Sequence, residues 1–313
     1  CGTASYACDV AKYAIEKYSR IPVQVELSHE FRYRDPIVTK NTLIVAVSQS
    51  GETMDTLMAT RYAKEQGAKV LAICNTQGAT LARESDAVIY THAGPEVAVA
   101  STKALTAQIT AGFLLALFLG AGREKLSTAE LRHLGLELLK MPAHVTEVIE
   151  NLDLARALGK QMANAKSVLF LGRNVGFPIA MEGALKLKEL AYIHAEGFAA
   201  GELKHGPIAL IEEGQPVIVI VPSQRDEESL HPKVISNIQE IRARGAKVIA
   251  IAEEGDNQVA DYAEHVIFVP QSESMFAPIL TVIPLQVFAL ELSTAKGLDV
   301  DQPRNLAKSV TVE

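Results

Sequence analysis

The fold of this chain is decided by one stretch, Leu43-Ile44-Val45-Ala46-Val47-Ser48-Gln49-Ser50-Gly51-Glu52-Thr53. Its uninterrupted apolar start is typical of a buried parallel strand, and a helical pattern from Asp55 to Gln66 follows. Gly51 allows the backbone to approach an anion closely, and the N–H groups at the start of the next helix point toward that anion. Side-chain donors are supplied by Ser48, Gln49, Ser50 and Thr53.

These features predict a phosphate site. The loop has no lysine and lacks the Gly-Lys-Ser/Thr sequence that holds a nucleoside triphosphate and its metal. A small phosphorylated metabolite is therefore favoured as the ligand. The alternative is an ordinary strand-to-helix turn, in which Ser, Thr and Gly are common without any ligand.

The same order of elements occurs twice along the chain. Gly-Ala precedes Lys69-Val70-Leu71-Ala72-Ile73 and also precedes Lys247-Val248-Ile249-Ala250-Ile251. In the first half we expect strands at 42–47, 69–74 and 86–91 and helices at 55–66 and 102–119. In the second half we expect strands at 167–171, 216–221, 247–251 and 265–269 and helices at 179–193, 233–244 and 276–296.

Alternating strands and helices predict an α/β fold of two similar domains, each a parallel, doubly wound sheet. The expected divisions are a first domain at 1–125, a connecting helical segment at 126–155, a second domain at 156–298 and a tail at 299–313. Cys1-Gly2-Thr3 looks like the end of a strand and the turn after it. We therefore expect the chain to be a fragment whose first strand is truncated.

Composition narrows the class of partner. The chain has 313 residues, a net charge of −7 and 48% hydrophobic residues, so nucleic acid is a poor expectation. Three cysteines without metal-ligand spacing fit a reducing cytoplasm. The longest uninterrupted apolar stretch, 111–119, is about half of a membrane span, so no membrane is expected.

Ligands of open parallel sheets bind beyond the carboxyl ends of the strands. Two first-half loops meet this condition, Ser48–Thr53 and Gly94–Lys103. The corresponding second-half loop, Val221–Asp226, carries a proline and two opposed charges instead of the Ser/Thr cradle. The first half is therefore predicted to hold the phosphate.

The second half carries the titratable groups. Glu182, Lys186 and Glu189 are spaced by four and three residues, so they share one face of a helix that is otherwise mostly apolar. The narrow charged stripe suggests a cleft, and a solvated ladder of ion pairs is the alternative. His205 follows in a loop bounded by glycines, where it could pass a proton, and a structural histidine is the alternative.

The end of the chain has no helical period, and such a tail is normally frayed. Lys308 lies between Ala307 and Ser309 in this segment. If the tail folds over a site, its amine could form a Schiff base with a carbonyl substrate.

These motifs together resemble the glucosamine-6-phosphate synthase family, the glutamine–fructose-6-phosphate aminotransferases. The resemblance covers essentially the whole chain and matches the family's isomerase part, two flavodoxin-like sugar isomerase (SIS) domains. The motifs that carry it are Cys1-Gly2-Thr3, Ser48–Thr53, Val99-Ala100-Ser101-Thr102-Lys103, Leu187-Lys188-Glu189, Glu202-Leu203-Lys204-His205-Gly206-Pro207 and Pro303–Glu313.

The resemblance implies a role for each matched position. Glu189 would move a proton between C1 and C2 of the sugar, Lys308 would form an imine with the open-chain ketose, and His205 would open the ring. Lys186 would tune the charge of Glu189. Contacts to phosphate and sugar would come from Thr3, Ser48, Gln49, Ser50, Thr53, Val99, Ser101 and Ala307.

The implied substrates are fructose 6-phosphate and glucosamine 6-phosphate, with no metal or organic cofactor. A homodimer is implied, because His205 would come from the neighbouring subunit, as is a glutaminase domain in the full-length chain. One departure is Ala4, where the family has Ser, so one phosphate hydroxyl is missing or displaced to Ser5. A phosphosugar sensor without catalysis and a plain aldose–ketose isomerase remain as alternatives.

Overall fold

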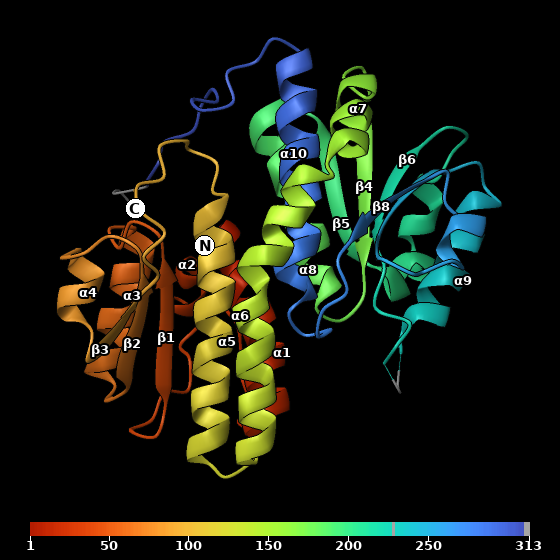
Figure 1. Cartoon of the computed structure of the whole chain (residues 1–313). Coiled ribbons are helices and arrows are strands. Elements are labelled where there is room, and N and C mark those ends of the chain that lie inside the picture. The colour runs from red at the N-terminus through yellow and green to blue at the C-terminus, as the bar shows by residue number, and fades with distance from the viewer. Residues whose placement is uncertain (227–228, 310–313) are drawn as a thin grey trace. The chain divides into compact units, whose positions relative to one another are not determined.

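The computed structural model describes residues 1–226 and 229–309. The end of the tail motif, 310–313, lies outside the described residues. The chain divides into two compact units, here called unit 1 (1–127 and 304–313) and unit 2 (128–303). Each is a mixed α/β unit with a parallel sheet, which confirms the predicted fold class (Figure 1).

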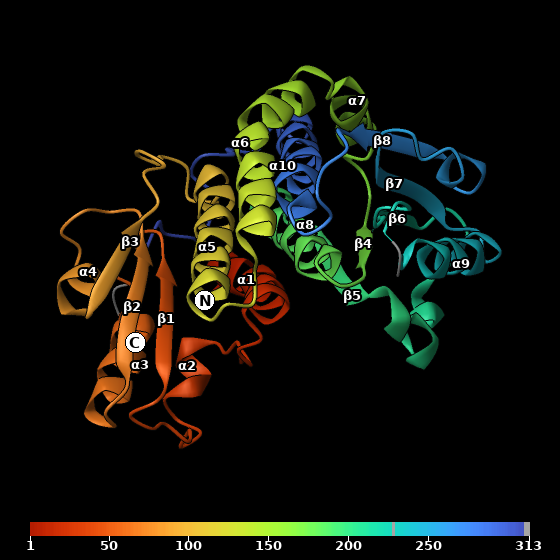
Figure 2. The same ribbon diagram turned by 60° about the horizontal axis from the view of Figure 1, so that its bottom comes forward.

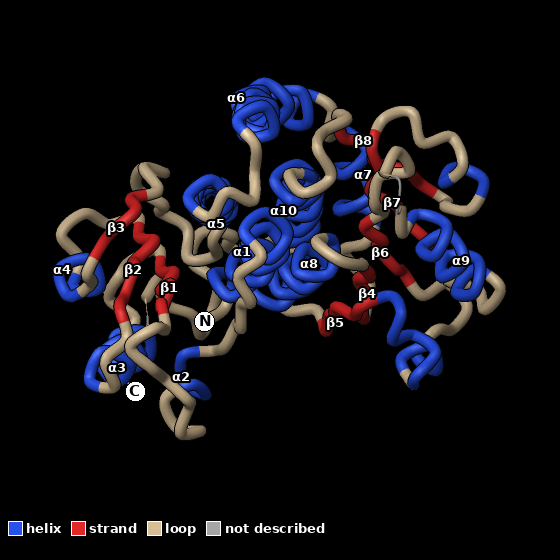
Figure 3. Tube along the Cα trace, turned by 90° about the horizontal axis from the view of Figure 1, so that it is seen from below, coloured by secondary structure: helices blue, strands red, loops and turns tan. Residues whose placement is uncertain are grey.

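Among its described residues, unit 1 contains three parallel strands in the order β1-β2-β3. The strands are β1 (Leu43–Ser48), β2 (Lys69–Cys74) and β3 (Ala87–Tyr90). The helices are α1 (Thr3–Ser19), α2 (Ser28–Phe31), α3 (Met54–Glu65), α4 (Thr80–Glu84) and α5 (Lys103–Gly122). Helices α3 and α4 cover one face of this sheet, and α1 and α5 lie on the other (Figure 3).

The register of unit 1 aligns the ends of its first two strands. Leu43 pairs with Lys69 and Ser48 pairs with Cys74, so the loops that follow both strands leave the sheet at the same edge. Burial of Ala46, Val70 and Ala72 against helix side chains forms the core of the unit. The sheet thus brings the Ser48–Thr53 loop beside the residues that follow Cys74.

The described part of unit 2 contains five parallel strands in the order β5-β4-β6-β7-β8. The strands are β4 (Ser167–Gly172), β5 (His194–Ala199), β6 (Pro216–Ile220), β7 (Lys247–Glu253) and β8 (His265–Val269). The helices are α6 (Thr128–Glu150), α7 (Asp153–Gln161), α8 (Gly176–Ala191), α9 (His231–Arg242) and α10 (Ala277–Ala295). Short 3-10 helices are η1 (Ala200–His205), η2 (Pro207–Leu210) and η3 (Val259–Asp261).

The strand order of unit 2 is that of flavodoxin-like sheets, with the crossover between β4 and β6. Helices α8 and α10 lie on one face and α9 on the other (Figure 3). Strand β6 pairs with both β4 and β7 and is buried from Val217 to Ile220. A continuous apolar strand is needed there because helices cover both faces of the sheet.

Two helices correct the expectation that no segment approaches a membrane span. Among the described residues, α5 and α10 are long and apolar enough to cross a membrane by length and composition alone. The count of uninterrupted apolar residues missed them because polar residues such as Gln108 interrupt the runs. Both are mostly buried, 61% and 67% of their apolar windows, α5 against α1 (Figure 2) and α10 against α7 and α8. Buried core helices pass the same test, so the finding is weak evidence for a membrane.

Candidate active site

The loop after β1 is held by its own side chains and backbone. The Oγ of Ser48 accepts a hydrogen bond from the N–H of Gly51 at 2.9 Å, and the Oγ of Ser50 accepts from the N–H of Glu52 at 3.2 Å. Thr53 occupies the cap position of α3 and makes no side-chain capping bond there. The N-terminus of α3 is therefore a place where an anion is favoured.

Gly51 cannot be replaced without disturbing this loop. Its φ of 68° lies in the left-handed region. A Cβ at this position would lie 2.6 Å from the Cβ of Ala79 and 2.8 Å from the Sγ of Cys74. Its carbonyl accepts from the N–H of Leu81 at 3.0 Å. The close packing of backbone against neighbours is the structural reason for glycine in this loop.

Glu52 fixes the other side of the loop. Its carboxylate accepts a hydrogen bond from the N–H of Thr80, at the first residue of α4, at 2.7 Å. That backbone hydrogen bond lowers the pKa of Glu52. The side chain is therefore engaged with the protein and stays ionised at neutral pH.

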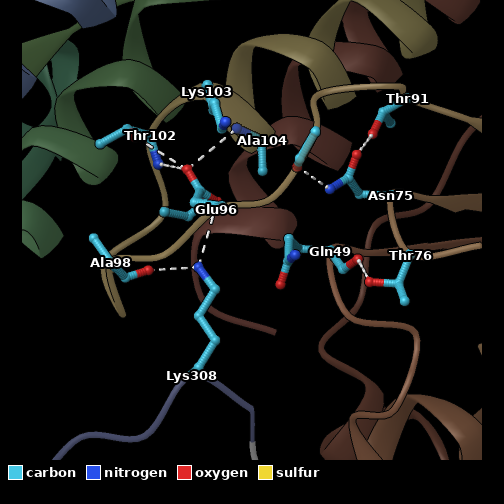
Figure 4. Close-up of polar contacts among 12 residues, drawn as sticks. Gln49, Asn75, Thr76, Thr91, Glu96, Ala98, Thr102, Lys103, Ala104 and Lys308 are labelled. Atoms are coloured by element: carbon cyan, nitrogen blue, oxygen red, sulfur yellow. Dashed lines mark hydrogen bonds and ion pairs between the residues drawn. The ribbon is translucent and has the colours of Figure 1, made fainter. Parts of the chain in front are cut away.

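Asn75, the residue after β2, ties two loops together (Figure 4). Its N–H donates to the carbonyl of Gln49 at 3.3 Å, while its side-chain Nδ2 donates to the carbonyl of Gly94 at 2.8 Å. Its Oδ1 accepts from the Oγ1 of Thr91 at 3.0 Å and from the N–H of Ala93 at 2.9 Å. Asn75 thus fixes the loop after β3 against the loop after β1.

A hollow of about 460 Å³ opens beside these loops. Its lining comes from the segments that follow the three strands of unit 1. The lining residues are Gln49, Asn75, Thr76, Gln77, His92, Gly94 and Pro95. Its position at the carboxyl edge of a parallel sheet is where ligands of such sheets bind.

Glu96, in the loop between β3 and α5, lies beside Lys308 of the C-terminal tail (Figure 4). The Nζ of Lys308 donates to the carbonyl of Ala98 at 2.6 Å and lies 3.5 Å from Oε2 of Glu96. The Glu96 side chain is only 3% exposed. The tail at Lys308 has no regular secondary structure, yet its amine is docked against unit 1. The expectation of a frayed tail is therefore wrong for Lys308.

Unit 2 buries a lysine between two carboxylates on α8. Lys186 and Glu182 are 0% exposed and lie 3.3 Å apart, and Lys186 also donates to Glu189, whose side chain is 22% exposed. Burial alone would lower the pKa of Lys186, but the charges of Glu182 and Glu189 raise it above its ordinary value. The alternative of a solvated ion-pair ladder is wrong, because Glu182 and Lys186 are fully buried and only Glu189 is partly exposed.

The loop around His205 folds as the 3-10 helix η1. His205 is exposed, and no hydrogen bond or ion pair joins it to Glu189 in the described parts of the chain. Lys204 is paired with Glu240 of α9 at 2.9 Å. The positive charge of Lys204 is therefore paired with a carboxylate on a neighbouring helix.

The strand ends of unit 2 are filled by their own side chains. Arg225, after β6, makes two hydrogen bonds with Glu253 of β7 at 2.8 and 2.9 Å, and it donates to the carbonyl of Ser272. The Oγ of Ser223 donates to Glu253 at 2.6 Å. Hydrogen bonds from Arg225 raise its own pKa, so the guanidinium is a permanent cation. Two N–H groups of the guanidinium donate to the two carboxylate oxygens of Glu253.

The remaining candidate residues lie in unit 1. Thr3 is the buried first residue of α1, and Ser5 donates its Oγ to the carbonyl of Gly2 at 2.6 Å. The Oγ of Ser101 donates to Glu96 at 3.3 Å, Val99 lies in the same loop, and Ala307 is exposed next to Lys308. The hydroxyl expected beside Ala4 is therefore engaged with the backbone.

The sequence matches the model of the SIS domain family over residues 1–118 and 161–296. The chain belongs to the SIS domain family. Each of its two units carries one of the matched segments.

The SIS chain is also similar to named proteins. It is 65% identical over 313 residues to the glutamine–fructose-6-phosphate aminotransferase (isomerizing) of Corynebacterium efficiens, and 66% identical to that of Leifsonia xyli. All of this chain is covered, but it spans about half the length of these curated relatives. A solved C-terminal domain of the aminotransferase from Francisella tularensis is 40% identical with a TM-score of 0.92, over 97% of this chain and 85% of that one.

Two polar residues of the first SIS unit were not predicted from the sequence. Asn75 and Glu96 make several of the hydrogen bonds that order the loops after β2 and β3. Asn75 directly follows a buried strand, which is the same signal that singled out Ser48. Glu96 precedes the polar start of a long apolar helix, where a carboxylate is expected to accept backbone N–H groups.

Proposed function

We propose that this chain converts fructose 6-phosphate and ammonia to glucosamine 6-phosphate and water, for amino-sugar (UDP-N-acetylglucosamine) biosynthesis. One observation carries the proposal: unit 1 places a docked lysine amine, Lys308, at the sheet edge that also holds the Gly51 loop. A phosphosugar needs both an anion site and a group that reacts with its carbonyl. The 65% identity to a glutamine–fructose-6-phosphate aminotransferase supports this substrate.

The phosphate is assigned to the loop after β1 and to the start of α1. A glycine turn, hydroxyl groups and two helix N-termini supply donors without any lysine. The residues assigned to phosphate are Thr3, Ser48, Gln49, Ser50 and Thr53. Val99, Ser101 and Ala307 are assigned to the sugar, because they flank the loop and the tail that hold the Lys308 amine.

Lys308 is assigned the covalent step. Its amine adds to the C2 carbonyl of the open-chain ketose and water leaves, which gives an imine. Ammonia then displaces the lysine and leaves a 2-imino sugar. Docking of Nζ by a carbonyl and a carboxylate restricts the amine to a small region, which favours reaction with a bound sugar.

Glu189 is assigned the proton transfer that completes the reaction. A 2-imino sugar becomes a 2-amino aldose when one proton leaves C1 and one returns to C2, and a single carboxylate can do both. The partial exposure of Glu189 leaves it accessible to a ligand, while the buried Lys186 holds a positive charge against it. Lys186 is therefore the group that tunes Glu189.

His205 is assigned to opening the sugar ring, which precedes imine formation. Its exposed imidazole is available to a neighbouring molecule. We infer a homodimer in which His205 acts on the sugar of the partner subunit. The compartment we infer is the cytoplasm, which agrees with the three free cysteines, Cys1, Cys8 and Cys74.

Glutamine hydrolysis is assigned to the half of the relatives that this chain does not cover. The 313-residue chain is then expected to use ammonia and to ignore glutamine. Glutamine-dependent amination by this chain would contradict that assignment.

Borohydride trapping tests the function. Fructose 6-phosphate and borohydride are expected to give a stable secondary amine on Lys308, identified by mass spectrometry, and Lys308→Arg is expected to give none. Phosphosugar binding without any adduct would favour a sensor instead. Interconversion of fructose and glucose 6-phosphates that ammonia does not redirect would favour a plain isomerase.

A further inference from the structure

Glu96 joins two parts of unit 1 that lie far apart in the sequence. It is 212 residues away from Lys308, and its carboxylate is nearly excluded from water. Glu96 takes part in no step of the proposed reaction. A buried carboxylate is costly unless hydrogen bonds and a countercharge compensate for its lost hydration.

The first oxygen of Glu96 is bound to the start of α5. Oε1 accepts from the N–H of Thr102 at 2.7 Å, from its Oγ1 at 3.0 Å and from the N–H of Ala104 at 3.4 Å. The helix that begins there has 20 residues and packs against α1. The carboxylate is therefore anchored to the N-terminus of a long, packed helix.

The second oxygen faces the tail. Oε2 accepts from the Oγ of Ser101 at 3.3 Å and lies 3.5 Å from the Nζ of Lys308. The side chain of Lys308 is 29% exposed, so it is partly accessible to solvent while its amine is held. Lys308 lies in neither a helix nor a strand. Oε2 of Glu96 and the carbonyl of Ala98 therefore determine where its amine lies.

We propose that Glu96 is a positioning residue that transmits the fixed geometry of the α5 N-terminus to the amine of Lys308. It touches neither the phosphate loop nor the reacting carbon, and it acts through the lysine. The inference rests on the proposed function for the role of Lys308. The docking itself is a property of the folded chain and can be measured without a substrate.

The two oxygens have different partners, which makes the proposal testable with one atom. In Glu96→Gln the remaining carbonyl oxygen can still accept the N–H groups of Thr102 and Ala104. The new NH₂ replaces Oε2 and cannot accept from the Lys308 ammonium. The helix start is thus kept while the contact with Lys308 is lost.

Two measurements follow. With fructose 6-phosphate, Glu96→Gln is expected to slow borohydride trapping at Lys308 at least tenfold, while the Kd of the sugar phosphate changes less than threefold. Without sugar, acetylation of Lys308 by acetic anhydride is expected to rise at least threefold relative to the exposed Lys125. Glu84→Gln removes a carboxylate from the Arg61–Glu84 pair and is the matched control, with neither readout changed.

The outcomes separate the two proposals. Glu96→Gln trapping within twofold of the unchanged chain, with unaltered Lys308 acetylation, would overturn the positioning role. If the unchanged chain traps no sugar, the proposed function fails, and the acetylation ratio alone decides the role of Glu96. If Glu96→Gln does not fold, Glu96→Asp withdraws the charge by one methylene and is expected to give an intermediate acetylation ratio.

Discussion

The carboxyl edges of the two parallel sheets occupy corresponding positions in the two units, but their loops use their polar side chains differently. In unit 1 the loop after β1 bonds to its own backbone and borders a hollow of about 460 Å³. In unit 2 the loop after β6 sends Arg225 onto Glu253 of the neighbouring strand. The first edge is open to a ligand, while the second is occupied by an internal ion pair.

The two loops differ in whether their polar groups remain available to a ligand. A guanidinium paired with a carboxylate and a backbone carbonyl is unavailable to a phosphate. In the loop after β1, serine hydroxyls accept hydrogen bonds from backbone N–H groups of the same loop. These bonds fix the loop and leave the adjacent hollow unfilled. Four substitutions test this difference.

The first concerns the internal pairing of charges in unit 2. Lys186→Met leaves the buried Glu182 and the adjacent Glu189 without their cation, so we expect a loss of about 3–5 kcal/mol of unfolding free energy. Urea unfolding measures it. Lys188→Met, on the exposed face of the same helix, is the control, with an expected change below about 0.5 kcal/mol. Equal effects would show that α8 is uniformly sensitive.

The second breaks the open edge of unit 1. Gly51→Ala adds a methyl group against Ala79 and Cys74 at positive φ, so we expect a cost of about 2–4 kcal/mol and at least tenfold weaker binding of fructose 6-phosphate. Calorimetry measures the binding. Gly78→Ala has a similar φ of 70° but open space around it, so about 1 kcal/mol and unchanged binding are expected. Normal binding by the Gly51 variant would remove this loop from the phosphate site.

The third opens the edge of unit 2. Arg225→Gln removes a partly exposed ion pair, with an expected cost of about 0.5 kcal/mol. Binding of fructose 6-phosphate is expected to stay within twofold, because the ion pair belongs to unit 2 and the assigned phosphate loop belongs to unit 1. A large loss of binding, measured by the same calorimetry, would mean that unit 2 takes part in holding the anion.

The fourth is a small dependence of stability on pH. Burial tends to raise the pKa of Glu96, but hydrogen bonds from Thr102 and the charge of Lys308 lower it below the ordinary 4.5. The stabilisation is therefore present above pH 4.5 and is lost as the pH falls through the lower folded-state value. Urea midpoints between pH 6 and 3 should fall less steeply for Glu96→Gln. An identical slope would show that Glu96 contributes nothing to acid unfolding.

Most of the sheets could be predicted from the sequence. Strands β2 and β8 begin and end at the predicted residues, because uninterrupted Val/Ile runs bounded by turns have few other solutions. The helix α1 and the strand β5 were not predicted. The residues of β5, such as Glu196 and Gly197, lack a strand pattern and pair only because β4 lies beside them.

The site was predictable in part. Ser48, Gly51 and Lys186 were predicted from their residue type and their position in or beside a strand or helix. The structure has these strands and helices at those positions. The docking of Lys308 depends on Glu96, more than two hundred residues earlier, and no local pattern encodes that contact. The hydrogen bonds of Asn75 to Thr91 and Gly94 likewise follow from strand order.

The many backbone bonds of the loop after β1 have a thermodynamic consequence. The carbonyl of Gln49 accepts from Asn75 and Thr76, and that of Gly51 accepts from Leu81, before any ligand arrives. The loop is therefore ordered before a ligand binds, so ligand binding costs little further conformational entropy of this loop. Under the proposed function, selectivity among phosphorylated sugars would then reside in the side chains around the hollow, while the loop would recognise only the phosphate group that these sugars share.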